Sequence, residues 1–269
     1  MFRQKCPVVK NEKTVPGHFT LTLRSPRISK NAKPGQFVQI QCAADSCDPL
    51  LPRPFSFLTA GPSDFSILYQ VVGKGTEILA HKKKGDEVWI VGPLGNGFSA
   101  GMRDGGRGVS VLVGGGVGIP PLFHLAQELI KRRTRKENIH VFLGARDKSL
   151  LLCERDFKKL GVHIHLATDN GSKGKKGFIT ELLNDFLHSS PIPHPPSQIF
   201  TCGPTPMLKA VSRLATKYKT PCEVSVEEPM ACGFGACLGC AIEVEKNGTK
   251  RFAIACCEGP VFKAEEIVW

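Results

Sequence analysis

The chain has 269 residues, which is more than one typical domain but fewer than three full ones. Its formal charge of +12 lies in short basic runs without a nucleic-acid-binding module around them, which favours a solvated surface facing an acidic partner or a phosphate-bearing cofactor over nucleic-acid binding. No stretch is apolar enough to span a membrane and the first residues lack a leader's apolar core, so we expect a cytoplasmic protein whose eleven cysteines are reduced or metal-bound.

Residues 1–103 are predicted to form a β domain. Alternating or apolar segments bounded by turn residues occur at 19–24, 36–41, 55–58, 65–72 and 87–91. Residues 76–81 are typical of a short helix, with Thr76 as its N-cap. About six short strands with one small helix predict a closed or nearly closed antiparallel β-barrel.

Residues 104–221 are predicted to form an α/β domain. A continuous apolar strand at 109–113 is followed by a glycine-rich turn and a helix with one apolar stripe. Further strands are expected at 139–143, 163–166 and 198–201, and further helices at 153–160, 179–188 and 206–218. This alternation predicts a parallel sheet with helices on both faces.

Residues 222–269 are predicted to form a small β-rich segment. A strand is expected at 223–227, and two strands at 241–246 and 249–255 flank Asn247-Gly248, a strong signal for a type I′ hairpin. This hairpin would return the thiols of Cys256 and Cys257 towards the cysteine-rich loop that precedes the hairpin.

That loop has the spacing C-x4-C-x2-C, at Cys232, Cys237 and Cys240, and a fourth thiol follows at Cys256 or Cys257. This spacing is typical of a loop that wraps a [2Fe–2S] cluster with four thiolates. Glycines between the cysteines allow tight turns and bring N–H groups close to the sulfurs. The alternatives are a zinc site, which usually takes two well-separated cysteine pairs, and buried free cysteines.

Two features of the barrel suggest anion binding. Arg53-Pro-Phe-Ser56 stands at a strand start, where arginine can pair with a phosphate and the serine hydroxyl can hydrogen-bond a ring. Gly73-Lys-Gly75-Thr76 stands at a helix start, where free N–H groups favour a phosphate. Two anion sites in one small barrel suggest a cofactor with a pyrophosphate.

Two features of the α/β domain suggest a nucleotide site. The run Gly114-Gly115-Gly116-Val117-Gly118 joins a strand to a helix, although its spacing is not G-x-G-x-x-G and a tight β–α connection would explain it as well. Cys202-Gly203-Pro204 ends the last strand of the sheet, at the edge where ligands bind in such folds. Cys202 could approach a nicotinamide ring or be a buried structural thiol.

Taken in order, these motifs resemble the ferredoxin–NADP reductase superfamily. With the cysteine loop and the ending Glu258-Gly-Pro-Val-Phe262, essentially the whole chain resembles the electron-transfer subunits of type B dihydroorotate dehydrogenases. In this family a variable residue separates the last cysteine ligand from the acidic residue before Gly-Pro. The resemblance therefore implies Cys256 as the fourth cluster ligand, beside Cys232, Cys237 and Cys240.

The resemblance also implies the cofactor sites. FAD would be held by Arg53, Pro54, Phe55, Ser56, Leu68, Tyr69, Gln70, Gly75 and Thr76. Gly114, Gly115, Gly116, Gly118, residues 144–146 and residues 168–169 would line the site of NAD(H), with Cys202 as the catalytic thiol. The basic run at 173–176 leaves the preference between NAD and NADP open, because a 2′-phosphate favours such charge.

The function implied is electron transfer in pyrimidine (UMP) biosynthesis. A separate FMN-containing catalytic subunit would oxidise dihydroorotate, and its electrons would pass through the [2Fe–2S] cluster and FAD to NAD+, in a heterotetramer with two copies of each subunit. One alternative is a small diaphorase subunit of another flavin and iron–sulfur complex, of the transhydrogenase or sulfhydrogenase type. The other is a non-enzymatic iron–sulfur scaffold with a degenerate flavin site.

Overall fold

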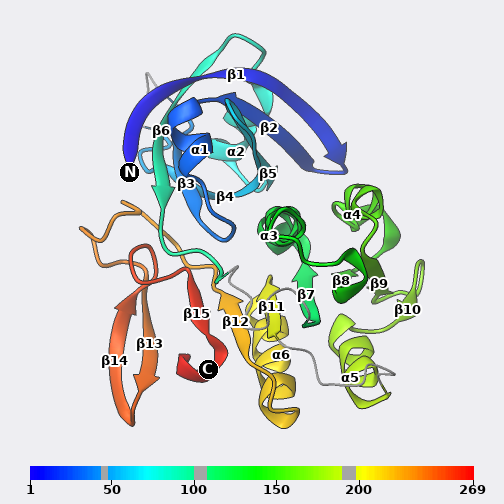
Figure 1. Cartoon of the computed structure of the whole chain (residues 1–269). Helices are drawn as coiled ribbons and strands as arrows, with labels where there is room; N and C mark the ends of the chain where they lie inside the picture. The colour runs from blue at the N-terminus through cyan, green and yellow to red at the C-terminus, as the bar shows by residue number, and fades with distance from the viewer. Residues whose placement is uncertain (44–47, 100–107, 190–197) are drawn as a thin grey trace.

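The computed structural model describes residues 1–43, 48–99, 108–189 and 198–269. Helix α3 (Ile119–Lys131) lies between a barrel and the sheet of an α/β layer, and a C-terminal segment carries its own hairpin (Figure 1). The predicted boundary between the first two domains, at 103/104, lies outside the described residues.

The N-terminal part is a closed antiparallel barrel, as predicted, with strand order β1-β2-β5-β4-β3-β6. Its strands are β1 (Phe2–Val15), β2 (His18–Arg24), β3 (Phe37–Gln41), β4 (Arg53–Ala60), β5 (Asp64–Gln70) and β6 (Glu87–Leu94). The sequence patterns do not predict β1, which closes the barrel because its first half pairs with β6 and its second half with β2.

Two short helices, α1 (Pro26–Asn31) and α2 (Lys74–His81), accompany the barrel. The prediction of Thr76 as the N-cap of α2 is wrong, because the helix begins two residues earlier, after Gly73. The Thr76 hydroxyl instead accepts hydrogen bonds from the backbone N–H groups of Val72 and Gly73, at 2.9 and 3.3 Å. It thereby fixes the turn that leads into the helix.

The second part is a seven-stranded sheet with the order β10-β9-β8-β7-β11-β12-β15. Its strands are β7 (Ser110–Gly115), β8 (Ile139–Ala145), β9 (His163–Thr168), β10 (Lys175–Lys176), β11 (Gln198–Cys202), β12 (Cys222–Ser225) and β15 (Val261–Lys263). All neighbours are parallel except β12 and β15. Helices cover both faces, as predicted. Helices α3 and α4 (Glu154–Leu160) share one buried cluster, and α5 (Ile179–Ser189) and α6 (Thr205–Lys217) share the other.

Short 3-10 turns connect these elements, at η1 (Gly116–Gly118), η2 (Lys136–Asn138), η3 (Lys148–Leu150) and η4 (Ala264–Glu266).

The C-terminal segment is tied to the sheet at both ends. Strand β12, which precedes the cysteine loop, extends the parallel sheet beside β11, and β15 returns antiparallel to it. Between them stands the predicted hairpin of β13 (Ala241–Lys246) and β14 (Thr249–Ile254). Asn247 and Gly248 have φ of 54° and 76°, the positive values that a type I′ turn requires.

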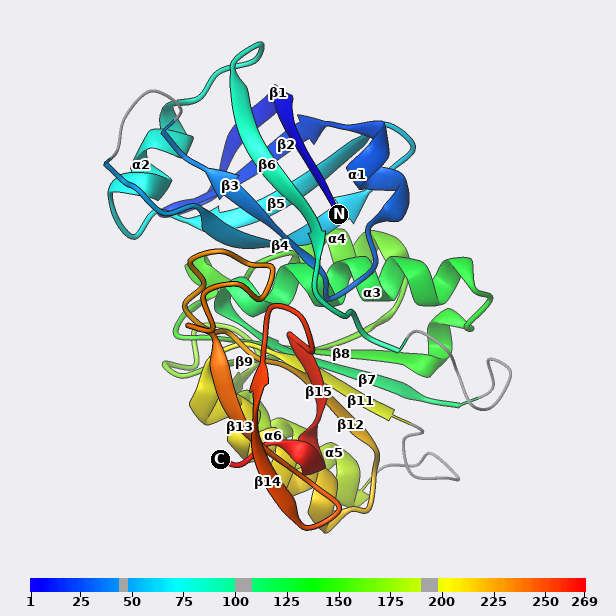
Figure 2. The same cartoon turned by 90° about the vertical axis from the view of Figure 1, so that its left-hand side faces the viewer.

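Figure 2 shows the barrel stacked on helix α3, with the hairpin of β13 and β14 extending away from the barrel. Shared buried clusters hold the three parts together. Phe37 and Leu94 of the barrel pack in one cluster with Val244 and Ala253 of the hairpin. Leu58 of the barrel packs in another cluster with residues of α3. Because such burial is the main favourable term in folding, the barrel, sheet and cysteine segment are fixed against one another. No helix within the described residues is long and apolar enough to cross a membrane.

Candidate functional site

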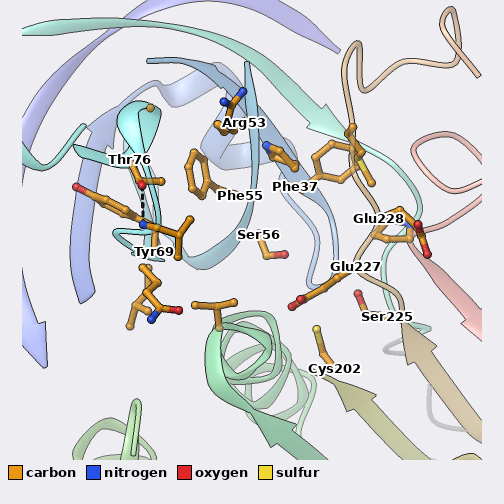
Figure 3. Close-up of a pocket in the computed structure, with 18 of the residues that line it drawn as sticks. Phe37, Arg53, Phe55, Ser56, Tyr69, Thr76, Cys202, Ser225, Glu227 and Glu228 are labelled. Carbon is orange, nitrogen blue, oxygen red and sulfur yellow. Dashed lines mark hydrogen bonds between the residues drawn. The ribbon is translucent and has the colours of Figure 1, made fainter. Parts of the chain in front are cut away.

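A cavity of about 510 Å³ opens where the barrel, the end of β11 and the C-terminal segment meet (Figure 3). The barrel side of its wall contains all nine residues that the sequence assigns to FAD: Arg53, Pro54, Phe55, Ser56, Leu68, Tyr69, Gln70, Gly75 and Thr76. Cys202 lines the same cavity from the opposite side. The structure therefore brings residues far apart in the chain into one continuous wall.

Arg53 and the start of α2 form a cradle for an anion. Arg53 Nη1 donates to the carbonyl of Leu51 at 2.7 Å, which fixes the guanidinium at the cavity wall. A Cβ on Gly75 would lie 3.6 Å from Arg53 Nε, an ordinary contact distance, so the arginine and the helix start are neighbours in the cavity wall. A fixed guanidinium beside free helical N–H groups is the arrangement that binds phosphates.

Aromatic and hydroxyl groups line the middle of the cavity. The Phe55 ring lies edge-on to Tyr69, with centroids 5.8 Å apart. The Tyr69 ring also stacks on Phe19, and its hydroxyl donates to Asn11 Oδ1 at 3.3 Å. Burial raises the pKa of Tyr69 to about 12, so its phenol stays neutral. Ser56 turns its hydroxyl towards the open cavity (Figure 3).

Cys202 forms the floor of this cavity with its sulfur directed inwards (Figure 3). It is 2% exposed. Burial raises the pKa of the Cys202 thiol, and the nearby charge of Glu227 raises it further. Cys202 is therefore a neutral thiol that can contact a bound ring, not a thiolate nucleophile.

Glu227 and Glu228 also line the cavity, and the sequence analysis does not identify them. They follow β12, the strand beside β11, so the sheet brings them close to Cys202. The surrounding protein raises the pKa of both carboxyl groups by desolvation. No motif in the sequence marks them, because Glu227 ends the expected strand at 223–227 and Glu228 simply follows it.

A second cavity of about 510 Å³ lies at the carboxyl ends of the parallel strands, and Gln70 lines both cavities. It is lined by Gly115, Gly116, Gly144, Ala145, Arg146 and Asp169, all of them in predicted nucleotide segments. Thr168, from the same prediction, is fully buried instead, and its hydroxyl donates to the carbonyl of Lys173 at 2.8 Å. This edge of a parallel sheet is where nucleotides bind in such folds.

The other two predicted glycines pack inside the protein. A Cβ on Gly114 would lie 2.9 Å from Leu122 Cδ1, and one on Gly118 would lie 2.4 Å from the carbonyl carbon of Cys202. Neither residue lines either large cavity. Gly114 thus lets α3 approach β7 closely, and Gly118 lets the turn before α3 approach β11. This is the tight β–α connection that the sequence analysis gives as the alternative to a nucleotide site.

The basic run at 173–176 is directed away from the second cavity. Lys173 Nζ lies 2.6 Å from Glu154, and Lys175 pairs with Asp185. None of the four residues lines this cavity, whereas Asp169 does. The charged side chains in the wall of the second cavity are therefore Arg146 and Asp169, and the basic run does not contribute to it.

Backbone N–H groups of the cysteine loop already donate hydrogen bonds to cysteine sulfurs. The backbone N–H groups of Phe234 and Cys237 each donate to Cys232 Sγ at 3.5 Å. Against the opposing effect of burial, the backbone N–H donors of Cys237 and Phe234 lower the pKa of Cys232 to about 6. Gly235 has φ of 87°, and its N–H donates to Cys256 Sγ at 3.1 Å. Thiolates and cluster sulfurs require such donors.

The fourth thiol lies in a turn. The strand expected at 249–255 ends at Ile254, and Cys256 and Cys257 follow it in a turn. Cys256 is buried, and its N–H donates to Cys240 Sγ at 3.4 Å, whereas Cys257 is exposed. Within the described residues, no three potential ligands are already gathered at metal-binding distance.

Asn96 anchors this turn to the barrel. Its Nδ2 donates to the carbonyls of Cys257 and Glu258, at 3.0 Å each, and its N–H donates to the carbonyl of Gly259. Asn96 comes from the segment that follows β6. The barrel therefore fixes the position of the fourth thiol relative to the first cavity.

Two family models match the chain. The oxidoreductase NAD-binding domain matches residues 112–213, and the iron–sulfur cluster binding domain of dihydroorotate dehydrogenase B matches residues 227–268. The second match covers the cysteine loop and the hairpin.

Whole-chain relatives carry one description. The dihydroorotate dehydrogenase B (NAD(+)) electron transfer subunit of Desulforamulus reducens is 40% identical, over 94% of each chain. The chain belongs to this family of electron transfer subunits. A relative in the family, from Geobacillus sp. strain WCH70, is 34% identical over 100% of this chain and 99% of its own.

Solved structures share the architecture. A chain of the NADH-dependent reduced ferredoxin-NADP oxidoreductase is 33% identical, with a TM-score of 0.83 over 98% of this chain and 90% of its own. A ferredoxin NADP+ reductase from Neisseria gonorrhoeae is 17% identical, with a TM-score of 0.67 over 80% of this chain and 91% of its own, and shows the fold alone.

The residues fit the cofactors of an electron transfer subunit in this family. Arg53 and the start of α2, neighbours in the wall of the first cavity, suit the pyrophosphate of FAD. The cysteine loop supplies thiols together with N–H donors for an iron–sulfur cluster. The second cavity suits the nucleotide of NAD(H).

Proposed function

We propose that this chain is an oxidoreductase subunit that takes electrons from a dihydroorotate-oxidising partner and delivers them to NAD+, in pyrimidine biosynthesis. Its resident cofactors are FAD and a [2Fe–2S] cluster, and NAD(H) is its co-substrate. One observation carries the proposal. Met230 and Pro260 of the cysteine segment line the same cavity as Arg53 and Ser56 of the barrel.

This shared wall suits electron transfer because residues near the cluster cysteines also line the first cavity. Met230 stands two residues before Cys232, and Pro260 stands four residues after Cys256. When bound, the cluster supplies one-electron chemistry, and FAD supplies hydride exchange with nicotinamide. The protein's own task is to hold the two groups next to each other through this shared wall.

The barrel residues bind and orient. Arg53 and the N–H groups at the start of α2 would hold the pyrophosphate, and Ser56 would donate to the flavin ring. On the opposite side, the neutral Cys202 thiol would contact the ring system where flavin and nicotinamide meet. Gln70, which lines both cavities, marks the passage between them.

The wall of the second cavity carries one acidic and one basic side chain, Asp169 and Arg146. Asp169 can accept hydrogen bonds from ribose hydroxyls. Two lysines of the neighbouring run, Lys173 and Lys175, are engaged by Glu154 and Asp185. In line with the NAD(+) in the description of the relatives, we propose NAD(H) as the ligand of this cavity.

The partner is a catalytic subunit that this chain serves. We propose that it contains FMN and forms a heterotetramer with two copies of each subunit, on the strength of the resemblance described above. We also propose a cytoplasmic location, which the free cysteines favour because a reducing compartment keeps thiols unpaired.

A second candidate function has one observation in its favour. The chain of the NADH-dependent reduced ferredoxin-NADP oxidoreductase is 33% identical over nearly the whole length. The chain could serve a flavin and iron–sulfur complex of that type with the same cofactors. The partner that co-purifies from the native cell separates the two candidates.

The cofactor content tests the proposal. Anaerobically purified protein is expected to contain about one FAD and about two iron atoms per chain, the content of one flavin and one [2Fe–2S] cluster. It should oxidise NADH with an artificial electron acceptor. Flavin analysis, iron analysis and the visible spectrum measure the first result, and an acceptor assay measures the second. A folded protein that lacks both groups after anaerobic purification would contradict the proposal.

A further inference from the structure

Gln39 is a buried amide at the contact between the barrel and the cysteine loop. It lies on β3, between Val38 and Ile40, whose side chains point into the barrel core. Since neighbouring side chains on a strand point to opposite faces, Gln39 points out of the barrel, towards the C-terminal segment. It is nevertheless only 1% exposed.

The Gln39 amide has no protein partner in the part of the chain that the structure describes. Neither Nε2 nor Oε1 makes a hydrogen bond to a described residue, although both atoms are buried. A buried amide without a partner costs free energy, so such groups in native proteins usually serve a bound group. The unpaired amide therefore points to a ligand on this side of β3.

The residue that covers Gln39 is Gly233, directly after Cys232. A Cβ on Gly233 would lie 2.6 Å from Gln39 Cγ and 2.9 Å from its Nε2. Gly233 also has φ of 81°, which favours glycine. Because Gly233 has no side chain and adopts a positive φ, the backbone of the cysteine loop can pack directly against the Gln39 amide. Gln39 Nε2 is then directed at the residues that start with Cys232.

Sulfur is the acceptor that this loop offers. Cys232 and Cys256 already accept backbone N–H groups of the loop, and Cys240 accepts that of Cys256. A thiolate or a cluster sulfide accepts hydrogen bonds and donates none. Gln39 would add a side-chain donor from the barrel to donors that the loop supplies itself.

We propose that the Gln39 amide donates a hydrogen bond to a sulfur atom at the cluster site next to Cys232, either a thiolate or a cluster sulfide. This hydrogen bond raises the reduction potential of the cluster. Reduction adds one negative charge to the cluster, and a hydrogen-bond donor stabilises the more negative state more strongly. Gln39 is thus a positioning and tuning residue. The inference rests on the proposed cluster site and adds to it a specific contact from the flavin domain.

The test replaces Gln39 with methionine, which keeps the side-chain length and removes the donor. Gln41→Met is the control, because Gln41 is two residues along β3 on the same face. An EPR-monitored redox titration of the full-length, anaerobically purified holoprotein measures the potential. Gln39→Met should favour the oxidised cluster about tenfold, a downward shift of about 59 mV for a one-electron couple. Gln41→Met and the FAD potential should stay unchanged.

A wild-type cluster potential in Gln39→Met would overturn the inference. If that variant does not retain iron, Gln39→Asn decides, because it withdraws the amide by one methylene and should also lower the potential. Loss of iron from both variants with FAD retained would overturn the tuning role and assign Gln39 to cluster assembly. Wild-type protein without any cluster would instead contradict the proposed function itself.

Discussion

Replacement of Cys256 by serine is expected to abolish cluster assembly, whereas Cys257→Ser should retain nearly the full iron content. Cys256 is 2% exposed, accepts the N–H of Gly235 and donates its own N–H to Cys240 Sγ. Cys257 is exposed, although its sulfur lies 3.8 Å from that of Cys256. Iron content and the reduced-state EPR signal of each variant after anaerobic purification measure the outcome. The reverse result, with iron lost only from Cys257→Ser, would move the ligand by one residue.

The sequence selects Cys256 only through the family pattern that the resemblance implies, and the structure adds a physical basis. Strand β14 ends at Ile254, so both thiols lie in the turn that follows it. Within this turn, burial and hydrogen bonds select Cys256. Asn96 reinforces the selection, because it holds the carbonyl of Cys257 to the barrel and so orients the turn.

Replacement of Arg53 by alanine should weaken FAD binding about tenfold to a hundredfold. A charge-assisted hydrogen bond to a phosphate contributes roughly 1.5–3 kcal/mol, and each 1.4 kcal/mol corresponds to about a tenfold change in affinity. The iron content should not change, because the cysteines lie in another segment. Fluorescence titration of the apoprotein with FAD measures the affinity.

Arg24→Ala is the matched control, since Arg24 belongs to the same barrel but pairs with Asp64 at the surface. It should bind FAD like the wild type. Unchanged FAD affinity in Arg53→Ala would assign Arg53 a structural role, through its hydrogen bonds to the carbonyls of Leu51 and Pro52.

Local patterns predict much of the fold, because they reflect local physics. The alternation of the barrel strands, the apolar strand β7 and the Asn247-Gly248 turn each depend on a few neighbouring residues. Strand β1 is missed because Pro7 and the polar run at 10–13, with Lys10, Glu12 and Lys13, hide its alternation. Its role as the closing strand depends on pairing with both β2 and β6, which lie far apart in the sequence.

The candidate site likewise contains residues that local motifs identify and residues that only the fold brings together. Arg53 and the cysteines have residue types and spacings that indicate chemistry, so the sequence identifies them. Glu227 and Gln39 have no such motif, and they matter only because β12 joins the sheet beside β11 and the cysteine loop covers β3. The sequence cannot distinguish Gly114 and Gly118, which pack, from Gly115 and Gly116, which line the second cavity.

The most direct test of the central claim is an assay of dihydroorotate-dependent NAD+ reduction, with and without the catalytic subunit. The isolated chain should oxidise NADH with an artificial acceptor but should not oxidise dihydroorotate. Addition of the FMN-containing partner should produce NADH from dihydroorotate, measured by absorbance at the NADH band. Dihydroorotate oxidation by the isolated chain, or no NADH formation by a stable complex that contains all cofactors, would contradict the account.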